Sequence, residues 1–541
     1  MTSFDEAPFL VSLQNWALKH PLFMKRLIFG ILLALPAVCQ AGVVSGRVCD
    51  SNGIGIGGVP VSDGYEIVTT AYDGRYSIDT KKKLGLLFIS TPSGYEPATC
   101  HGNRPDFWRL LTTPADEPET VDFALRKVDD SRFAFLALAD NQISNRGGDV
   151  NCFTSTTVPD VNATVGELRS EGYEPFLILL GDQSHDRFWK DYRYGLPQAY
   201  SDIERMNARV YSVMGNHDHD PTATNDIDAG AEWRRFIGPE YYSFDKGGVH
   251  FVVLDDVEIV ENGPSLSKDG ECVYKNKVRK AELEWLAKDL ALVDKSTPVV
   301  LAIHVPLLAP PGMEEEFRLV NGAKLASLLA EFDTVEVISG HTHVSYAAQN
   351  GNIHETNYGA VCGSWWLNAR IDLGNDNNIC RDGTPSGYAV WTRTPEGFSN
   401  YFKGTGLDRS KQMRAYDLNC VEIDNAELTE SFLPGRKKAN EVLVNVWSYG
   451  PGWKVEMFER GKPLKVERVR SQDPLFLMSC SVPYIAKGKK LTGTVRPVFS
   501  WHMFKAKASK ANSPIDIKVT DREGRVYTRR LERPQPMTLD M

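Results

Sequence analysis

Five apolar runs between residues 133 and 343 each end in polar side chains that can bind a metal ion. In chain order they read FAFLALADNQ, PFLILLGD, VYSVMGNHD, VVLAIHVP and VEVISGHTH. Short apolar runs bounded by turn residues are typical of strands that are buried on both faces. A strand that ends in a ligand delivers it to the edge of a sheet. Five such strands side by side would therefore bring all of these ligands to one place.

The segments between these runs predict an alternation of strands and helices. KAELEWLAKDLALV has apolar residues at helical spacing, and YYSFDKGGVHFVVLDD has the pattern of a hairpin. This repetition predicts an α/β core that is built on mixed sheets, and we assign it to residues 129–412.

Two β-rich regions flank this predicted core. Residues 42–128 contain short alternating stretches, such as GVPVSDG and GRYSID, and predict an N-terminal β-sandwich. This region resembles the carboxypeptidase-regulatory or transthyretin-like domains that precede catalytic domains in exported proteins. Residues 413–541 contain EVLVNVWS, WKVEMFE and IDIKVTD, which predict a C-terminal β-rich domain.

The first 41 residues have the pattern of an export signal. Lys25 and Arg26 precede the apolar run LIFGILLALPAV, and Cys39-Gln40-Ala41 suits cleavage after Ala41. Met24 is an alternative start, directly before the basic pair. The run is too short to span a bilayer comfortably, so we expect cleavage and no transmembrane helix afterwards. The protein is predicted to be exported, to the periplasm, the cell surface or the medium.

Composition and charge narrow the possible partners. The chain has 541 residues, a formal net charge of −9 and no long basic run, so nucleic acid is not expected as a partner. Eight cysteines remain after loss of Cys39, and an even number in an exported chain permits disulfides. Sequence does not fix the pairing, and Cys49–Cys100 and Cys362–Cys380 are the simplest choices.

The polar residues at the strand ends suit a two-metal hydrolase, which needs carboxylates, neutral donors and one bridging carboxylate. Asp182 suits the bridge because Gly181 lets the backbone turn sharply before it. The other candidate ligands are Asp140, Asn216, His304, His341 and His343. His217 is the candidate proton donor to the leaving group, and we expect Asp218 to orient its ring.

These motifs resemble the calcineurin-like metallophosphoesterases, whose pattern is D-x-H, G-D-x-x-x-D, G-N-H-[DE], an isolated His and G-H-x-H. The matching residues are D-N-Q at 140–142, G-D-Q-S-H-D at 181–186, G-N-H-D at 215–218, His304 and G-H-T-H at 340–343. The resemblance implies two mixed β-sheets flanked by helices, a binuclear metal centre and hydrolysis of phosphate esters by a metal-bridging hydroxide. The order of the three domains resembles exported bacterial members of the family.

Carried over by position, the resemblance assigns both ligand sets. The first metal would take Asp140, Gln142, Asp182 and His343, and the second Asp182, Asn216, His304 and His341; His217 matches the catalytic histidine. Gln142 departs from the usual His, and its harder amide oxygen favours manganese, magnesium or ferrous iron over zinc. The cofactors are therefore predicted to be two divalent ions, with Mn, Fe, Zn and Mg all open.

A small phosphorylated molecule is the predicted substrate, and His185, Asn141 and Trp366 are candidates to contact it. The same metal centre serves mono- and diesters, so a nucleotide-type pyrophosphatase or phosphodiesterase is an alternative. A second alternative is a non-catalytic cell-surface protein that has lost turnover through Gln142 and binds a glycan or a partner.

Overall fold

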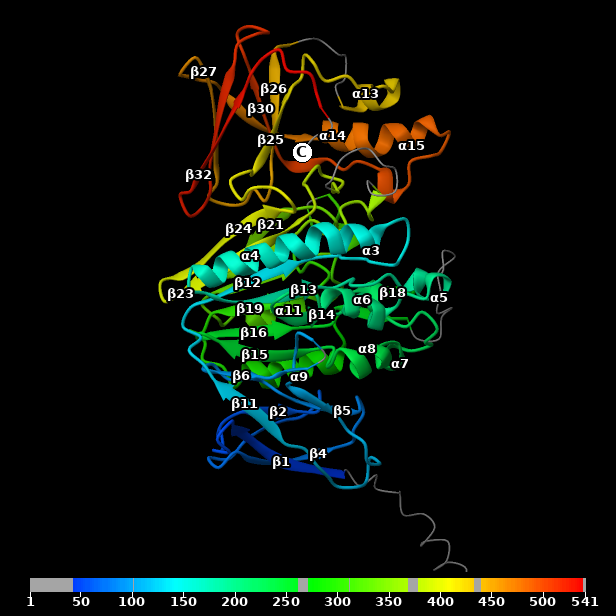
Figure 1. The fold of residues 1–541 in the computed structure, drawn as a ribbon, viewed down its shortest axis with the longest axis vertical. Coiled ribbons are helices and arrows are strands. Elements are labelled where there is room, and N and C mark those ends of the chain that lie inside the picture. Colours follow the sequence, from blue (N-terminus) through cyan, green and yellow to red (C-terminus); the bar gives the residue numbers. More distant parts are fainter. Residues whose placement is uncertain are drawn as a thin grey trace, which may run out of the picture.

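The computed structural model describes residues 42–538 apart from 101, 261–270, 311, 368–377 and 433–438. The described residues form three regions that are stacked along the long axis, with the N-terminal and C-terminal strands at opposite ends of a central layered core (Figure 1). The predicted signal peptide lies outside the described residues. Within the described part of the chain, each helix is too short or too polar to cross a bilayer.

The core contains two mixed sheets. The strands of the first sheet are β12 (Phe133–Leu138), β13 (Glu174–Leu180), β14 (Arg209–Val213), β23 (Gly387–Thr394) and β24 (Gly397–Gly404), in the order β14-β13-β12-β23-β24. The strands of the second are β15 (Tyr242–Lys246), β16 (Val249–Val253), β19 (Val299–Ala302), β20 (Val335–Ser339), β21 (Tyr346–Asn350) and β22 (Ile353–Asn357), in the order β15-β16-β19-β20-β22-β21. All five strands that carry predicted ligands pair in parallel with a neighbour. A hairpin pairs β17 (Val257–Ile259) with β18 (Tyr274–Asn276).

Strand β12 shows why the ligand-bearing runs are apolar throughout. Its alternate residues Phe133 and Phe135 belong to the hydrophobic cluster between the two sheets. There the ring centroid of Phe135 lies 5.7 Å from that of Phe251 in β16. The intervening Leu136 and Leu138 belong to the cluster that contains the outer helices. Both faces are therefore buried, and each large side chain contributes about 1.5–3 kcal/mol through burial.

The helical elements of the core lie on the outer faces of the sheets or in the loops that follow the strands. They are α3 (Asp149–Cys152), η1 (Phe153–Thr157), α4 (Val158–Ser170), η2 (Asp186–Phe188), α5 (Trp189–Tyr192), α6 (Leu196–Ile203), η3 (Asn216–Asp218), α7 (Asp226–Ala229), α8 (Ala231–Phe236), α9 (Lys280–Leu290), α10 (Glu314–Phe317) and α11 (Gly322–Leu329). Helix α9 is the one predicted from apolar spacing, and it buries Leu283, Trp285 and Leu286. The predicted fold class, two mixed sheets flanked by helices between two β-rich regions, is confirmed.

The N-terminal region consists of two small sheets and a separate pair of short strands. Its strands are β1 (Gly42–Asp50), β2 (Pro60–Ser62), β3 (Ile67–Thr69), β4 (Arg75–Thr80), β5 (Leu86–Ile89), β6 (Tyr95–Pro97), β7 (Thr99–Cys100), β8 (Arg104–Pro105), β9 (Trp108–Leu110), β10 (Glu119–Thr120) and β11 (Phe123–Lys127). One sheet has the order β10-β1-β11-β6 with β4 on β1, and the other β3-β2-β5-β9. Strand β4 alternates exposed and buried residues, as a strand with one face in a core must.

The C-terminal region has two sheets and a helical segment. The strands are β25 (Met413–Asp417), β26 (Glu441–Val446), β27 (Lys454–Glu459), β28 (Lys462–Pro463), β29 (Val466–Ser471), β30 (Ser500–Lys507), β31 (Ile515–Thr520) and β32 (Val526–Leu531). They form the orders β25-β26-β30-β29 and β28-β27-β31-β32. The helical elements are α13 (Ala426–Phe432), α14 (Pro474–Phe476), η4 (Leu477–Ser481), α15 (Val482–Ala486) and η5 (Gly493–Val495).

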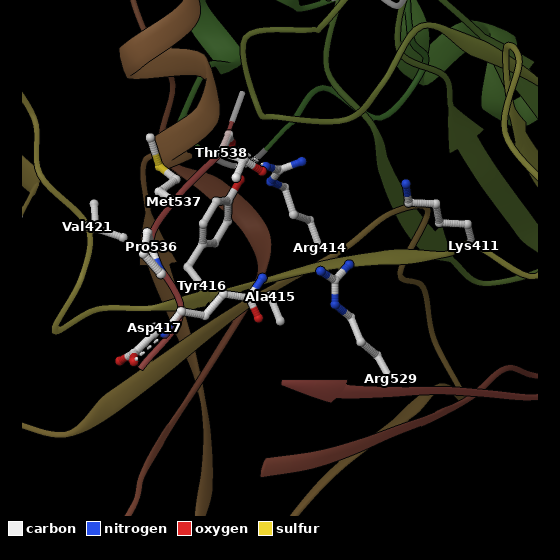
Figure 2. A pocket seen from close by; sticks show the side chains of 11 residues that line it. Lys411, Arg414, Ala415, Tyr416, Asp417, Val421, Arg529, Pro536, Met537 and Thr538 are labelled. Carbon is white, nitrogen blue, oxygen red and sulfur yellow. Dashed lines mark hydrogen bonds between the residues drawn. The ribbon is translucent and has the colours of Figure 1, made fainter. Parts of the chain in front are cut away.

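A cavity of about 110 Å³ lies within this region, between residues 411–421 of the β25 segment and residues 529–538. Arg414 of β25 and Arg529 of β32 both extend towards it (Figure 2). Arg414 donates a hydrogen bond to the carbonyl of Thr538, and Asp417 is held by Arg533 at 3.0 Å. Apart from Lys411, the lining comes from the C-terminal region, and it includes none of the predicted ligands.

The described cysteines are thiols in this structure, so it shows neither predicted disulfide. The thiol of Cys49 donates to the carbonyl of Phe123, and that of Cys380 to the carbonyl of Ala360. Disulfide formation stays a prediction that depends on export to an oxidising compartment.

Candidate metal centre

The predicted ligands of both sheets meet at the carboxyl ends of the parallel strands. The first sheet supplies Asp140, Gln142, Asp182 and Asn216, and the second supplies His304, His341 and His343. His304 Nε2 lies 3.1 Å from Asn216 Oδ1 and 3.3 Å from Asp182 Oδ1. It also lies 3.1 Å from His341 Nδ1. The ligand atoms of Asp182, His304 and His341 all lie within 4.8 Å of one another, which is close enough to share one ion.

A second group of ligands lies beside the other carboxylate oxygen of Asp182. His343 Nε2 is 3.3 Å from Asp140 Oδ1. Gln142 Nε2 donates to Asp182 Oδ2 over 2.9 Å. Asp182 therefore turns one oxygen towards His304 and the other towards Gln142. A carboxylate that bridges two metal ions needs this arrangement.

Hydrogen bonds on the outer ring nitrogens fix the orientation of two of the histidines. His304 Nδ1 lies 2.7 Å from the carbonyl oxygen of Leu180, and His343 Nδ1 lies 2.9 Å from that of Gly363. Since a carbonyl only accepts, each Nδ1 carries the proton and each Nε2 faces the carboxylates. Metal-binding histidines are commonly oriented by such a bond on the nitrogen that does not bind the metal.

The donor set fits a pair of divalent ions. Asp140 Oδ1 is buried and accepts no hydrogen bond from the described residues. Burial, together with the charge of neighbouring His304, holds the pKa of His341 well below its usual value, so that its imidazole is neutral. An ion that binds His304 would displace the proton from its Nε2, and neutral imidazoles, amide oxygens and carboxylates are the ligands that manganese, iron and zinc bind.

Several ligands sit in strained backbone. Residues with left-handed φ angles are Asp140 (53°), Gln142 (41°), Asp182 (53°), His341 (69°) and His343 (53°). Such conformations cost on the order of 1–3 kcal/mol each and persist only where the surroundings enforce them. Gly181 shows how closely the loops approach, because a Cβ atom there would lie 2.3 Å from His304 Nδ1. The backbone is thus strained at five candidate ligands, where it turns their side chains back over the edge of the sheet.

His217 lies next to this ligand set. Its backbone amide donates to Asp182 Oδ1 over 2.9 Å, and its Nδ1 lies 2.7 Å from Asp186 Oδ1. Asp186 Oδ2 in turn accepts the amide of Cys272 over 2.8 Å. Burial lowers the pKa of His217, but the carboxylates of Asp182 and Asp186 outweigh it and raise that pKa to about 10. A protonated ring held in this way is suited to donate a proton.

The prediction that Asp218 orients His217 is wrong. The carboxylate of Asp218 accepts the backbone amides of Gln183 at 2.9 Å and Gly215 at 3.0 Å, so it fastens two ligand loops together. Asp186 has the orienting position, and sequence reasoning missed it. The available signal was its place as the last residue of the G-D-Q-S-H-D motif.

His185 and Asn141, two of the three predicted substrate contacts, lie close to this centre. The His185 ring lies 3.9 Å from that of His217, and its Nδ1 has no hydrogen-bond partner among the described residues. Burial and the charge of His217 lower the pKa of His185 to about 4, so the ring is neutral. Asn141 donates to Gln183 Oε1 over 2.7 Å, which ties the first two ligand loops together.

The third predicted substrate contact, Trp366, is a core residue. Its side chain is 2% exposed, packs against Phe153 and donates from Nε1 to the carbonyl of Asn141. Trp365 instead faces the centre: it is half-buried and stacks on His343 with ring centroids 4.1 Å apart. The substrate-contact prediction is therefore corrected for Trp366, and adjacent Trp365 is the aromatic residue at the ligands.

Three family models match successive parts of this chain. The model described as N terminal of Calcineurin-like phosphoesterase matches residues 42–128. The model of Calcineurin-like phosphoesterase itself matches residues 133–345, the stretch that carries every predicted ligand. The model described as C terminal of Calcineurin-like phosphoesterase matches residues 355–527.

A curated relative is the serine/threonine-protein phosphatase CPPED1 of Bos taurus, which is 26% identical over 182 residues. This match spans 31% of the present chain and 53% of the relative, about half its length. Among solved structures, a dimetal phosphatase from Danio rerio is similar with a TM-score of 0.36 and 15% identity, covering 50% of this chain and 96% of that one. The NAD nucleotidase of Haemophilus influenzae is similar with a TM-score of 0.28 and 12% identity, covering 51% of this chain and 49% of that one.

Proposed function

This chain belongs to the calcineurin-like phosphoesterases, with additional N- and C-terminal domains, and on that premise we propose that it hydrolyses phosphate esters at a binuclear metal centre. The observation that carries the binuclear proposal is the position of Asp182. Its Oδ1 faces His304 at 3.3 Å while its Oδ2 accepts from Gln142 at 2.9 Å. A single-metal site has no need for a carboxylate shared between two groups of ligands.

Each ion has its own set of ligands. The first would be held by Asp140, Gln142, Asp182 and His343, and the second by Asp182, Asn216, His304 and His341. Gln142 can present its amide oxygen after a half-turn of the amide, since the two ends of the group have nearly the same shape. Two bound divalent ions would supply a bridging hydroxide nucleophile near neutral pH and offset charge on the phosphoryl oxygens.

His217 is the residue that supplies a proton to the leaving group. His217 Nδ1 is engaged by Asp186, so Nε2 is the nitrogen left for the ester oxygen. The buried carboxylates favour the protonated ring, and bound cations would bring its pKa back towards neutrality. General acid catalysis of this kind contributes typically about 10²–10⁴-fold in rate.

Nucleotide diesters and pyrophosphates are the second candidate substrates. The observation in their favour is Trp365, whose half-buried indole stacks on His343 and places an aromatic surface at the ligands. An aromatic base bound beside the phosphate could stack there, as indole and base rings commonly do.

A substrate panel with manganese-loaded protein tests both candidates. Aryl phosphate monoester, aryl phosphate diester and a nucleotide sugar are compared for wild type and for His217→Ala. Turnover that the variant loses supports the hydrolase, and the preferred ester assigns its class. A wild type that binds two ions and turns over none of these esters would contradict the proposal and favour the non-catalytic binding protein.

We also propose that the protein acts outside the cytoplasm after cleavage behind Ala41. The support is the basic pair, apolar run and small-residue site within residues 1–41. Sequencing the N-terminus of protein recovered from the periplasm or medium of a bacterial host tests this. A mature chain that begins at Gly42 is expected, and an intact chain in the cytoplasm would contradict it.

A further inference from the structure

A chain of buried polar side chains crosses from the phosphoesterase core into the C-terminal region. It consists of Asp382, which lies in the core shortly before β23, and of four residues in or beside the C-terminal sheets: His502, Asn445, Asp473 and Tyr416. Every one of these side chains is buried. Burying this many polar groups is costly unless each is hydrogen-bonded, so their arrangement requires a reason.

The core end of this network fastens the loop that carries two metal ligands. Asp382 Oδ2 accepts the backbone amide of Ser345 over 2.6 Å, two residues beyond His343. Asp382 Oδ1 accepts the amide of Thr384 over 2.9 Å. Burial raises the pKa of Asp382, but the bonds from His502 and from these amides outweigh it and hold that pKa below its usual value. The carboxylate is thus a charged anchor for the loop.

The other end of the network lies in the C-terminal region. His502 Nε2 lies 3.1 Å from Asp382 Oδ2, and His502 Nδ1 lies 2.7 Å from Asn445 Oδ1. The Asn445 amide donates both to the Asp382 carbonyl at 3.0 Å and to Asp473 Oδ2 at 2.9 Å. Tyr416 also donates to Asp473. Because both amide hydrogens of Asn445 are used, its oxygen is fixed towards His502, and the ring of His502 is held from both sides.

The anchored loop needs such support because it is strained. His341 and His343 both have left-handed φ angles, 69° and 53°. Within the core, Asp140 Oδ2 accepts the amide of His341 over 3.0 Å, and Asn357 donates to the carbonyl of Gly340. These two contacts hold the first half of the loop. The second half, where His343 turns towards the first metal position, is held by Asp382 and by the carbonyl of Gly363, which accepts from His343 Nδ1.

We propose that Asp382 and His502 are positioning residues of the metal centre: the C-terminal region, through His502, supports the core residue Asp382, which anchors the ligand loop. This inference rests on the proposed function only in taking residues 340–343 as the ligand loop. It assigns the C-terminal region an indirect part in metal binding, because His502 supports Asp382 and Asp382 accepts the Ser345 amide, in place of a flanking or spacer role.

The test compares the full-length variants His502→Leu, His502→Gln and Asp382→Asn with wild type. His502→Leu removes the donor to Asp382, whereas His502→Gln keeps an N–H that can reach it. The matched control is His250→Leu. His250 is equally buried, with Asp245 at 2.7 Å and Asp289 at 3.0 Å. It lies in β16 and pairs with Val299 at the start of β19, opposite the end that carries His304.

The first measurement is manganese affinity, by competition with a chelator. Outer partners of metal ligands typically change affinity by about 10–100-fold, so we expect a loss of that size for His502→Leu and Asp382→Asn. His502→Gln should recover part of it. His250→Leu should lower the melting temperature and leave manganese affinity unchanged. Unchanged affinity in a folded His502→Leu, or an equal loss in the control, would overturn the proposal.

The second measurement is hydrogen–deuterium exchange of the metal-free protein over residues 338–346. Faster exchange of this segment in Asp382→Asn and His502→Leu than in the control is expected. Asparagine offers one neutral oxygen to the two amides of Ser345 and Thr384, and His502→Leu removes the donor that supports the Asp382 carboxylate. Equal exchange in all variants would overturn the proposal. This readout needs neither metal nor substrate, so absence of phosphoesterase activity in wild type would count against the proposed function alone. Asp382→Asn carries both tests where His502→Leu does not fold.

Discussion

Asp186 Oδ1 lies 2.7 Å from His217 Nδ1, and the second oxygen of the same carboxylate accepts the backbone amide of Cys272. Both oxygens of the Asp186 carboxylate therefore have a partner, and this fixes the direction in which it holds the His217 ring. This pairing connects the loop after β13 with the loop after β14. It also leaves one nitrogen of His217 available to a substrate.

Asp186→Asn is expected to lower kcat by roughly 10-fold, and His217→Ala by about 10²–10⁴-fold. The asparagine keeps the shape of the contact but removes the charge that favours the protonated ring. The loss should be largest for alkyl phosphates, whose leaving oxygen needs the proton, and small for nitrophenyl phosphate. Steady-state kinetics on both esters checks this. The control is Asp220→Asn, whose carboxylate accepts from Thr222 in its own turn and from no other described residue. A loss independent of the leaving group would contradict the assigned role.

Gly181→Ala should damage the metal centre more than its backbone strain alone explains. Gly181 has φ +88°, and a Cβ there would lie 2.3 Å from His304 Nδ1. Gly172 has a similar φ of +83° with nothing within 4 Å of its Cβ, so Gly172→Ala measures the strain by itself. We expect Gly172→Ala to lower the free energy of unfolding by about 1 kcal/mol, and Gly181→Ala to lower it by roughly 1–3 kcal/mol more. Only the latter should lose metal. Urea unfolding and metal analysis check both, and equal effects would contradict the steric argument.

Sequence was sufficient to predict that the candidate ligands lie together, because strand ends are a local signal. Apolar runs predicted β12, β13, β14, β19 and β20, and the residues just beyond them meet in the structure as expected. The fold class followed from the same pattern and is confirmed. In each case the information lies within about ten residues of the ligand, which is the range over which periodicity can be read.

The remaining assignments depend on which way a side chain turns after a strand, and sequence does not give that direction. Asp218 is next to His217 along the chain, yet Asp186, 31 residues earlier, meets the ring. Trp365 and Trp366 are neighbours with nearly equal φ angles, and only the first faces the ligands. The contact between Asp382 and His502 spans 120 residues and two regions, so no local pattern could have predicted it.

Stability of the metal-free protein should depend on His250 between pH 6.5 and 10. Burial lowers the pKa of this ring, but Asp289 and Asp245 outweigh it and raise that pKa to about 10. An unfolded histidine titrates near pH 6.5, so the contribution is fully present below about pH 6.5 and is lost as the pH rises towards 10. Urea unfolding at pH 6, 8 and 10 should show a decline in wild type that is smaller in His250→Gln. Parallel declines would contradict this account.

Gln142→His should shift metal preference towards zinc. Gln142 lies between Asp182 Oδ2 at 2.9 Å and the thiol of Cys362 at 3.6 Å, in the place where the family pattern has an imidazole. Zinc binds imidazole nitrogen better than amide oxygen, whereas manganese and magnesium prefer oxygen. We expect zinc affinity to rise by about 10-fold relative to manganese, with the ligand count unchanged. Gln142→Ala is the control, because it should lose affinity for both metals. Metal analysis after dialysis against an equal mixture of zinc and manganese measures the ratio. A ratio in Gln142→His equal to that of wild type would show that residue 142 does not bind the metal, and the first ligand set would then need another member.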